Sequence, residues 1–444
     1  MLRFALGLVL CLAAAAAPAS GDAEIAPGVF LAHGPADKTV SFRMIVRAGC
    51  GDEAGGCRGV SHYLEHLMLV GRNAQHEDQA LRFFADGSSN GWTRHASTGY
   101  SHSFPAGEDA IERLDRLFAF YAARLEGFDI APQEAARERN VVLQEHNWRV
   151  GSNPYAPLWR EVEAWFFPGH PLGQWAIADP ATIQSYTVEE AKAFHARWYR
   201  RDHVAFFVAG PIEAAALKAI VDRRLGAAPA AGPSPARDWL KVAPPAPETR
   251  RFARADARIV EPAATLWRTV RAPDLDAQKL RAARWLLVEF LASRLPGGPH
   301  AELVDRQEIA RSVRGFSIDL PAEGIAQIAM TATPDGGATP DATLAALSDY
   351  LAGLARRGLD EATLARLKQR YALAWERASR NAQARAARAS EWFALAATAP
   401  PDPASLAHTP GIVAALTKAE VDAVLAALAG SGREAQLVFT PAAP

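Results

Sequence analysis

The amino-acid sequence predicts an α+β protein of two domains, each a mainly antiparallel sheet packed with helices. Three observations support this fold class. The chain has 444 residues, more than one hydrophobic core usually supports. A Pro-rich stretch at 227–248 has neither helical nor strand periodicity and divides the chain into two parts of similar length. Strand-like and helix-like segments interleave in both parts without a strict βαβ rhythm.

The same mixture of elements recurs in the two parts, which are 24–226 and 249–444. In the first part we expect strands at 40–46 and 204–208, and helices at 59–70, 108–125, 132–148 and 188–198. In the second part we expect strands at 266–270, 325–331 and 436–440, and helices at 276–295, 343–357, 361–388 and 418–428. Their identity is too weak to prove an internal duplication.

The overall charge gives no reason to expect nucleic acid as a partner. The formal net charge is −1, with 22% charged and 49% hydrophobic residues, an ordinary globular balance. Basic residues do gather between Arg366 and Arg388. We interpret them as the solvated face of one long helix, because Leu367, Tyr371 and Trp375 give that segment an apolar stripe.

The N-terminus has the form of a secretory signal, residues 1–19. Arg3 precedes an apolar run that ends at Ala17-Pro18-Ala19, where small residues suit a cleavage site. The alternative is a membrane anchor, for which the run is short. We therefore expect a bacterial protein that is periplasmic or secreted, without stable membrane insertion.

Two cysteines, Cys50 and Cys57, remain once the signal is removed. In an oxidising compartment such a close pair can form a disulfide. Two free thiols are the alternative, because spacing alone does not establish the geometry.

The segment His62-Tyr63-Leu64-Glu65-His66 carries the chemistry. Residues four apart lie on one helix face, so both imidazoles point the same way. Two neutral imidazoles in this arrangement form a natural clamp for one Zn²⁺. Glu65 lies beside them and is free to act as general base.

A catalytic zinc needs a third protein ligand and one open position for water. Glu138 and Glu145 are 145 − 138 = 7 positions apart, two helical turns, and so share a face. We assign Glu145 as the third ligand. Glu138 is then a second carboxylate that orients a histidine or Glu145 itself.

These motifs resemble the pitrilysin/insulinase family, in particular its small two-domain bacterial members and the mitochondrial processing peptidase subunits. The H-x-x-E-H order of residues 62–66 is highly specific to this class of zinc peptidase. The other matches are looser and extend over almost the whole mature chain; they are residues 47–49, 59–67, 89–93 with Tyr100, 138–145, 168–173, 183–199 and 208–210.

The resemblance implies two homologous α+β domains that close around an extended peptide. It also implies that substrate adds as a strand to a sheet edge near the metal. Residues 88–93 match that edge, and Asn90 matches the family's substrate-contacting asparagine. From the residues alone, Asn90-Gly91 would be interpreted as an ordinary turn.

One departure from the family concerns the second domain. Members that act alone carry an Arg and, seven residues later, a Tyr that bind substrate. Val304 and Arg311 stand at those positions here, and no Tyr occurs between Tyr199 and Tyr350. We therefore expect the zinc-bearing subunit of a heterodimer, whose homologous zinc-free partner supplies the Arg/Tyr pair. A homodimer or a monomer with other substrate contacts is the alternative.

The function favoured by these features is a zinc metalloendopeptidase that hydrolyses extended peptides in the periplasm. Two other classes stay open. One is a non-catalytic peptide-binding or scaffold subunit, because a fold does not guarantee chemistry. The other is a maturation protease for one dedicated precursor.

Overall fold

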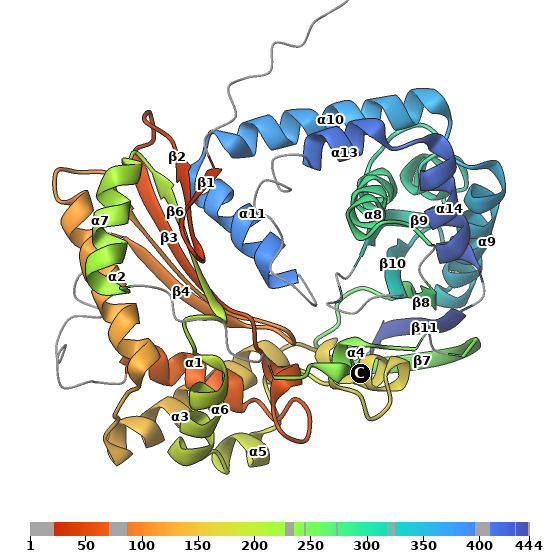
Figure 1. The fold of residues 1–444 in the computed structure, drawn as a ribbon. Coiled ribbons are helices and arrows are strands. Elements are labelled where there is room, and N and C mark those ends of the chain that lie inside the picture. The colour runs from red at the N-terminus through yellow and green to blue at the C-terminus, as the bar shows by residue number, and fades with distance from the viewer. Residues whose placement is uncertain are drawn as a thin grey trace, which may run out of the picture.

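The computed structural model describes residues 22–70, 87–226, 235–243, 246–271, 274–317, 320, 325–395, 409–430 and 432–442. The predicted signal at 1–19 lies outside the described residues. Two sheets, each with its own helices, lie side by side in Figure 1. Within the described segments, no helix combines the length and apolar character needed to cross a membrane.

The first sheet has six strands in the order β1-β2-β6-β3-β5-β4. Its strands are β1 (Asp22–Ala26), β2 (Val29–His33), β3 (Thr39–Val46), β4 (Ser88–Thr93), β5 (Thr98–Pro105) and β6 (Val204–Gly210). Neighbouring strands are antiparallel except for β2 and β6. β6 is buried along its whole length, so the sheet's centre is covered on both faces.

In Figure 1, the helices α2 (Ala110–Glu126) and α7 (Ala214–Arg224) flank the first sheet. The helices α1 (Val60–Val70), α3 (Pro132–His146), α5 (Pro180–Gln184) and α6 (Val188–Trp198) lie together below it. An aromatic cluster joins the sheet to α2: the Phe42 ring lies 5.3 Å from Phe118 and 5.4 Å from Tyr121. Burial of such large rings supplies much of the hydrophobic stabilisation of this half.

The second sheet has five strands in the order β7-β11-β8-β10-β9, antiparallel except for β7 and β11. Its strands are β7 (Glu248–Asp256), β8 (Ala263–Arg271), β9 (Ala310–Phe316), β10 (Ile325–Pro334) and β11 (Gly432–Pro441). Its helices include α8 (Ala277–Ala292), α9 (Pro340–Arg357), α10 (Glu361–Ser379), α13 (Thr409–Ala415) and α14 (Lys418–Ala429). The predicted fold class, two α+β units with mainly antiparallel sheets, is confirmed.

Each half lends one helix to the other half's sheet. The helix α4 (Ala156–Phe166) packs on the second sheet, where Phe166 contacts Trp267 at 5.3 Å between ring centroids. The helix α11 (Ala382–Leu395) packs on β3 and β6, where Phe393 contacts Phe207 at 5.7 Å. Figure 1 shows α11 on the face of the first sheet opposite to α2 and α7. This exchange was not predicted, and the residue limits of the two domains stay a prediction.

The single long helix predicted at 361–388 is wrong. α10 ends at Ser379, and α11 begins at Ala382 after a turn in which the Asn381 side chain accepts a hydrogen bond from the backbone N–H of Ala384 (3.0 Å). The basic residues are not all solvated either. Arg385 is buried, pairs with Asp37 and donates to the carbonyl of Ala32 at 3.2 Å.

Part of the range predicted as a linker is bound to the first half through one buried carboxylate. Arg237 makes two parallel bonds to Asp52, Nε to Oδ1 at 2.8 Å and Nη2 to Oδ2 at 2.9 Å. The indole N–H of Trp239 donates to the same Oδ1 at 2.8 Å. The Asp52 side chain is fully buried, so this charge depends on its partners for stabilisation.

We expect Arg237→Met to lower the free energy of unfolding by about 3–5 kcal/mol, because it leaves the Asp52 charge buried without its cation. Arg306→Met is the matched control, since the Arg306 side chain is 66% exposed in its pair with Glu302. Its expected cost is under about 1 kcal/mol. Urea unfolding of both variants measures the difference, and equal costs would contradict this account of Asp52.

Candidate metal centre

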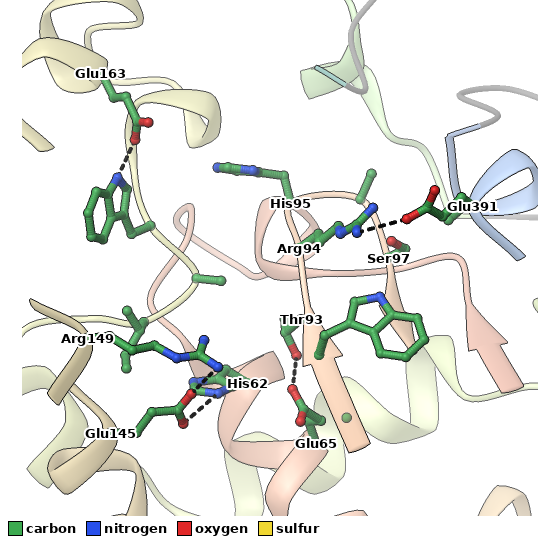
Figure 2. Close-up of a pocket in the computed structure, with 17 residues that line it drawn as sticks. His62, Glu65, Thr93, Arg94, His95, Ser97, Glu145, Arg149, Glu163 and Glu391 are labelled. Atoms are coloured by element: carbon green, nitrogen blue, oxygen red, sulfur yellow. Dashed lines mark hydrogen bonds and ion pairs between the residues drawn. The ribbon is translucent and has the colours of Figure 1, made fainter. Parts of the chain in front are cut away.

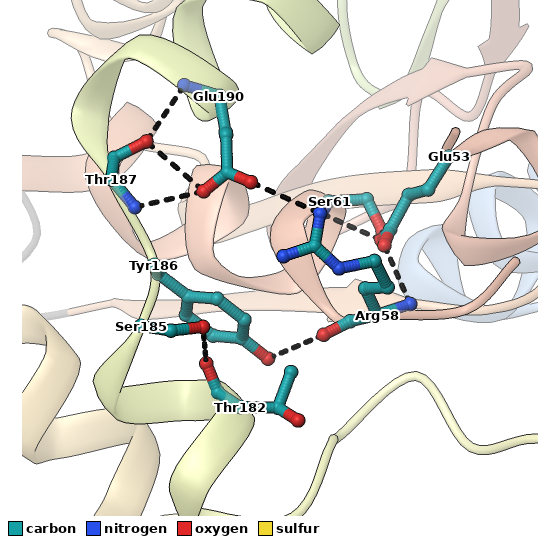
Figure 3. A network of polar contacts seen from close by, with 8 residues as sticks. All are labelled: Glu53, Arg58, Ser61, Thr182, Ser185, Tyr186, Thr187 and Glu190. Atoms are coloured by element: carbon teal, nitrogen blue, oxygen red, sulfur yellow. Dashed lines mark hydrogen bonds and ion pairs between the residues drawn. The ribbon is translucent and has the colours of Figure 1, made fainter. Parts of the chain in front are cut away.

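The helix that carries the H-x-x-E-H segment begins at a buried carboxylate. Oε1 of Glu53 accepts from the backbone N–H and the hydroxyl of Ser61, at 2.8 and 2.6 Å, and Oε2 accepts from the N–H of Arg58 at 2.8 Å. Figure 3 shows these bonds at the start of α1. A carboxylate at a helix N-terminus satisfies unpaired N–H groups and opposes the helix dipole. Burial raises the pKa of Glu53, and its bonds with Ser61 oppose that shift.

Contacts with two further helices fix the direction of α1. The Tyr186 hydroxyl donates to the carbonyl of Arg58 (2.8 Å), and the Arg58 guanidinium pairs with Glu190 of α6 at 3.0 Å (Figure 3). The Tyr63 hydroxyl donates to the carbonyl of Ala135 in α3 at 2.8 Å. Since α3 also carries Glu138 and Glu145, these contacts set the distance between the two groups of side chains.

The structure brings His62, His66 and Glu145 together. The Nε2 atoms of both histidines lie 3.3 Å from the same oxygen, Oε2 of Glu145. The two imidazole planes are nearly perpendicular, at 81°. On the other side of His66, its Nδ1 lies 3.6 Å from Oε2 of Glu138. Of the two roles considered for Glu138, the geometry therefore favours contact with His66.

This donor set fits a tetrahedral metal ion. One ligand atom from each of His62, His66 and Glu145 lies within 4.8 Å of the others. In a tetrahedral zinc site with bonds of about 2.0–2.1 Å, neighbouring ligand atoms are about 3.3–3.4 Å apart. Both Nε2–Oε2 distances, 3.3 Å, match that spacing. The Nδ1 atom of His62 is buried without a hydrogen-bond partner among the described residues.

The charges of these residues favour a cation between them. Burial raises the pKa of Glu145, but its bonds with His62 and His66 outweigh burial and hold that pKa well below its usual range. Burial lowers the pKa of His66, but Glu138 and Glu145 outweigh it and raise the pKa to about 9. Without a metal ion, the proton held by His66 offsets part of the charge of these carboxylates, and metal binding would displace it.

Glu65 stands beside the donor set without belonging to it. It is 5% exposed, and its Oε2 accepts from the hydroxyl of Thr93 at 2.8 Å. A side chain at Gly91 would place its Cβ 2.2 Å from Oε1 of Glu65, so glycine leaves the room that this carboxylate occupies. Burial raises the pKa of Glu65, while His62 and His66 oppose the rise. A carboxylate of raised pKa is suited to accept and return a proton.

Asn90 lies in β4 and is exposed. The interpretation of Asn90-Gly91 as a turn is therefore wrong: Asn90 pairs with Ser101 and Gly91 with Tyr100 in an antiparallel ladder. Among the described strands, β4 lies at the edge of the first sheet. Gly91, Trp92 and Thr93 line the cavity described next, and Asn90 is not among its lining residues in the described segments.

A cavity of about 680 Å³ opens over the donor set. Figure 2 shows its lining side chains, which are His62, Glu65, Gly91, Trp92, Thr93, Arg94, His95, Ala96, Ser97, Glu145, Arg149, Glu163, Trp175, Ala176, Ile177, Glu391 and Ala394. Within the described segments, the second half contributes to this lining through α11, where Glu391 pairs with Arg94 at 3.3 Å. Val304 and Arg311 lie elsewhere, and Arg311 pairs with Glu261.

The predicted disulfide between Cys50 and Cys57 is present, with an S–S distance of 2.13 Å. It closes the loop that holds the residues after β4. The backbone N–H of Cys50 donates to the carbonyl of Arg94 (3.0 Å), and that of Gly51 donates to the carbonyl of His95 (2.9 Å). The bridge thus supports one wall of the cavity.

Four charged residues of the cavity were not predicted as site residues: Arg94, Arg149, Glu163 and Glu391. Arg149 follows Glu145 by four positions, a helical spacing that the sequence did offer as a signal. Glu163 and Glu391 carried no such signal, because they come from the exchanged helices α4 and α11. Glu163 accepts a hydrogen bond from the indole N–H of Trp175, and burial raises its pKa from 4.5 to about 7.

Comparison with known proteins identifies the class to which this fold and site belong. Residues 28–175 match the family model described as Insulinase (Peptidase family M16), and residues 185–371 match the model described as Peptidase M16 inactive domain. The chain belongs to the pitrilysin/insulinase family of peptidases. The H-x-x-E-H segment lies in the first match, and the sequence of the second match contains none.

Several curated relatives are named proteases, which supports a peptidase role. The chain is 24% identical to "Zinc protease PqqE" of Helicobacter pylori over 39% of this chain and 38% of the relative. It is 30% identical to "Coenzyme PQQ synthesis protein F" of Pseudomonas aeruginosa over 77% of this chain and 44% of the relative. It is 27% identical to "Probable mitochondrial-processing peptidase subunit beta" of Schizosaccharomyces pombe over 49% of this chain and 48% of the relative. The chain thus spans less than half the length of these relatives.

Solved structures share the fold. The crystal structure of a protease from Helicobacter pylori superposes with a TM-score of 0.77 at 17% identity, over 93% of this chain and 97% of that one. The periplasmic protease PqqL from Escherichia coli superposes with a TM-score of 0.74 at 17% identity, over 94% of this chain and 47% of that one.

The raised pKa of Glu163 leads to a prediction about how the free energy of unfolding depends on pH. Its folded pKa is raised above the ordinary value of 4.5, so the folded state binds this proton more tightly than the unfolded chain. The resulting stabilisation is fully present below pH 4.5 and is lost as the pH rises to about 7, by up to about 3 kcal/mol. We expect Glu163→Gln to remove this loss.

The measurement is urea unfolding of metal-free protein from pH 4.5 to 8. The stability of Glu163→Gln relative to wild type should rise with pH, whereas Glu161→Gln, at an exposed position of the same helix, should run parallel to wild type. Parallel curves for Glu163→Gln would show that its carboxyl is not protonated in the folded state.

Proposed function

We propose that this chain is a zinc-dependent endopeptidase that hydrolyses extended peptides. The observation that carries the proposal is the spacing of three donor atoms, Nε2 of His62, Nε2 of His66 and Oε2 of Glu145, with Glu65 beside them. These three residues would hold one Zn²⁺ and leave a fourth position open. Bound zinc lowers the pKa of a water molecule to about 7 and polarises the peptide carbonyl.

The chain's own residues supply the proton transfer and the binding of substrate. Glu65 takes a proton from the attacking water and returns it to the leaving amine, while Thr93 holds its other oxygen. The outer edge of β4, which no other described strand pairs with, offers backbone donors and acceptors to which an extended peptide adds as a further strand. Asn90, exposed on that strand, is a contact for the peptide. Recognition through the backbone requires little of the substrate's sequence.

We expect Glu65→Gln to retain one zinc per chain and to lower peptide hydrolysis by about 10²- to 10⁴-fold, because the amide cannot accept the proton. Glu112→Gln, at a 63%-exposed side chain on α2, is the control and should leave hydrolysis unchanged. Zinc content is measured by elemental analysis and turnover with a quenched peptide. A chelator should abolish wild-type activity, and added zinc should restore it.

If the Glu65→Gln variant retained hydrolysis, Glu65 would not be the general base. A wild-type chain that binds peptide but no zinc would favour a non-catalytic peptide-binding or scaffold subunit instead. Activity confined to one precursor would indicate a maturation protease.

The proposed location is the periplasm or the exterior of a bacterial cell. The signal-like segment at 1–19 and the disulfide between Cys50 and Cys57 support it, because such bridges persist in oxidising compartments. A structural neighbour, PqqL of Escherichia coli, is titled a periplasmic protease.

The proposed assembly is a heterodimer in which this chain is the zinc-bearing subunit. Val304 and Arg311 stand where the family resemblance leads us to expect an Arg/Tyr pair, and both lie away from the cavity. One relative is named a processing peptidase subunit. A homologous zinc-free partner with the Arg/Tyr pair would complete substrate binding.

The purified chain should therefore hydrolyse peptides weakly by itself and at least ~10-fold faster with such a partner, because positioning contacts contribute to the barrier. The assay compares initial rates with and without the partner at fixed zinc. Full activity of the single chain would contradict the heterodimer and favour a monomer or homodimer.

A further inference from the structure

The two carboxylate oxygens of Glu145 have different partners, because Arg149 bonds to only one of them. Its Nη2 lies 2.8 Å from Oε1, while Oε2 faces both histidines at 3.3 Å. Figure 2 shows the Arg149 guanidinium reaching across to Glu145 beside His62. We propose that Arg149 is a positioning residue that keeps Glu145 a one-oxygen metal ligand. This inference rests on the metal-binding part of the proposed function.

Stability does not explain this contact. The Arg149 side chain is 57% exposed and pairs with Glu145 at the i,i+4 spacing. Pairs of this kind contribute about 0.3–0.5 kcal/mol in helices, because solvent screens them and two side chains lose freedom. The pair is nevertheless placed at the cavity, with Arg149 among the lining residues. Its effect on the carboxylate is therefore of more consequence than its effect on folding.

The backbone after α3 keeps the two side chains together. The α-helix runs to His146, and Asn147–Gly151 continue it as a π-helical turn. The N–H of Ser152 donates to the carbonyl of Asn147 at 2.8 Å, the five-residue step of that wider turn. Because the helix continues, Arg149 stays on the face of Glu145 and does not leave with a loop. Single π-turns inserted in α-helices occur frequently at functional sites.

The chemical consequence concerns the open position. A carboxylate with two free oxygens can bind a metal ion through both, which raises the coordination number above four when water keeps its position. A bond from Arg149 to Oε1 withdraws that oxygen and leaves Oε2 alone for the ion. Glu138, at 3.6 Å from Nδ1 of His66, acts on the opposite side of the site. Glu145 and His66 are then each oriented by a charged neighbour, which is typical of metal sites.

The test replaces zinc by cobalt(II), whose visible absorption weakens as the coordination number rises above four. Arg149→Gln should bind zinc about 10- to 100-fold more weakly in competition with a chromogenic chelator. Its cobalt form should absorb more weakly than the wild type. Arg149→Lys, which keeps a charged donor, should lie between them. Arg116→Gln is the matched control, because Arg116 also makes an i,i+4 pair with a glutamate, Glu112, on α2.

Wild-type affinity and spectrum in Arg149→Gln would overturn the inference. Weaker binding with an unchanged spectrum would also overturn it, because Arg149 would then affect affinity without setting the coordination number. If the wild type itself bound neither zinc nor cobalt, the proposed function would fail instead. Circular dichroism checks that each variant is folded, and Arg149→Lys carries the test if Arg149→Gln is not.

Discussion

Two adjacent buried carboxylates, Asp52 and Glu53, hold together the parts that form the candidate site. Burying a charge costs several kcal/mol unless it is paired or hydrogen-bonded. Asp52 is paired with Arg237, and Glu53 accepts hydrogen bonds from Ser61 and Arg58. Asp52 accepts hydrogen bonds from the Arg237 guanidinium and from the Trp239 indole N–H, so it binds the 235–243 segment to the first half. Glu53 caps the helix that carries the two histidines. The disulfide closes the same loop. Residues 50–57 thereby position the helix α1, the end of the strand β4 and the 235–243 segment between the two halves.

The candidate centre has an excess of negative charge, which favours the binding of a cation. Glu65, Glu138 and Glu145 all lie within reach of two imidazoles, in surroundings that are largely buried. In the metal-free site, protonation of His66 relieves part of this repulsion, which is why its pKa rises to about 9. A divalent ion relieves more of it and meets both nitrogens at tetrahedral spacing. Under the proposed function, the same charges that would destabilise an ordinary core would favour metal binding.

Sequence periodicity predicted the elements that bury a clear apolar face and missed those that do not. The predicted helix at 188–198 coincides with α6, whose start at Thr187 is a capping box. β7 was missed because Glu248–Asp256 is mostly charged and exposed, and it is held chiefly by its ladder with β11. β5 was missed because it buries polar residues, among them His102, which forms hydrogen bonds with Ser89 and Tyr121. The motif identified His62, Glu65 and His66 as candidates, whereas the exchange of α4 and α11 is a tertiary event without a local signal.

The two sides of the cavity differ in how firmly they are held. On the metal side, α1 and α3 are joined by buried bonds such as that of Tyr63 to Ala135, and few of the groups involved are exposed to water. On the other side, α11 packs on the sheet through Phe393, but its charged contact at the cavity itself is the pair of Arg94 with Glu391. Both side chains of this pair are 52% exposed, and such a pair contributes under about 1 kcal/mol. A site that must keep three donor atoms within tenths of an ångström needs the first kind of contact. Under the proposed function, a rim that admits an extended chain would use the second. The fold thus gives the candidate site a rigid frame and confines the contact that is cheap to break to the rim, at Arg94 and Glu391.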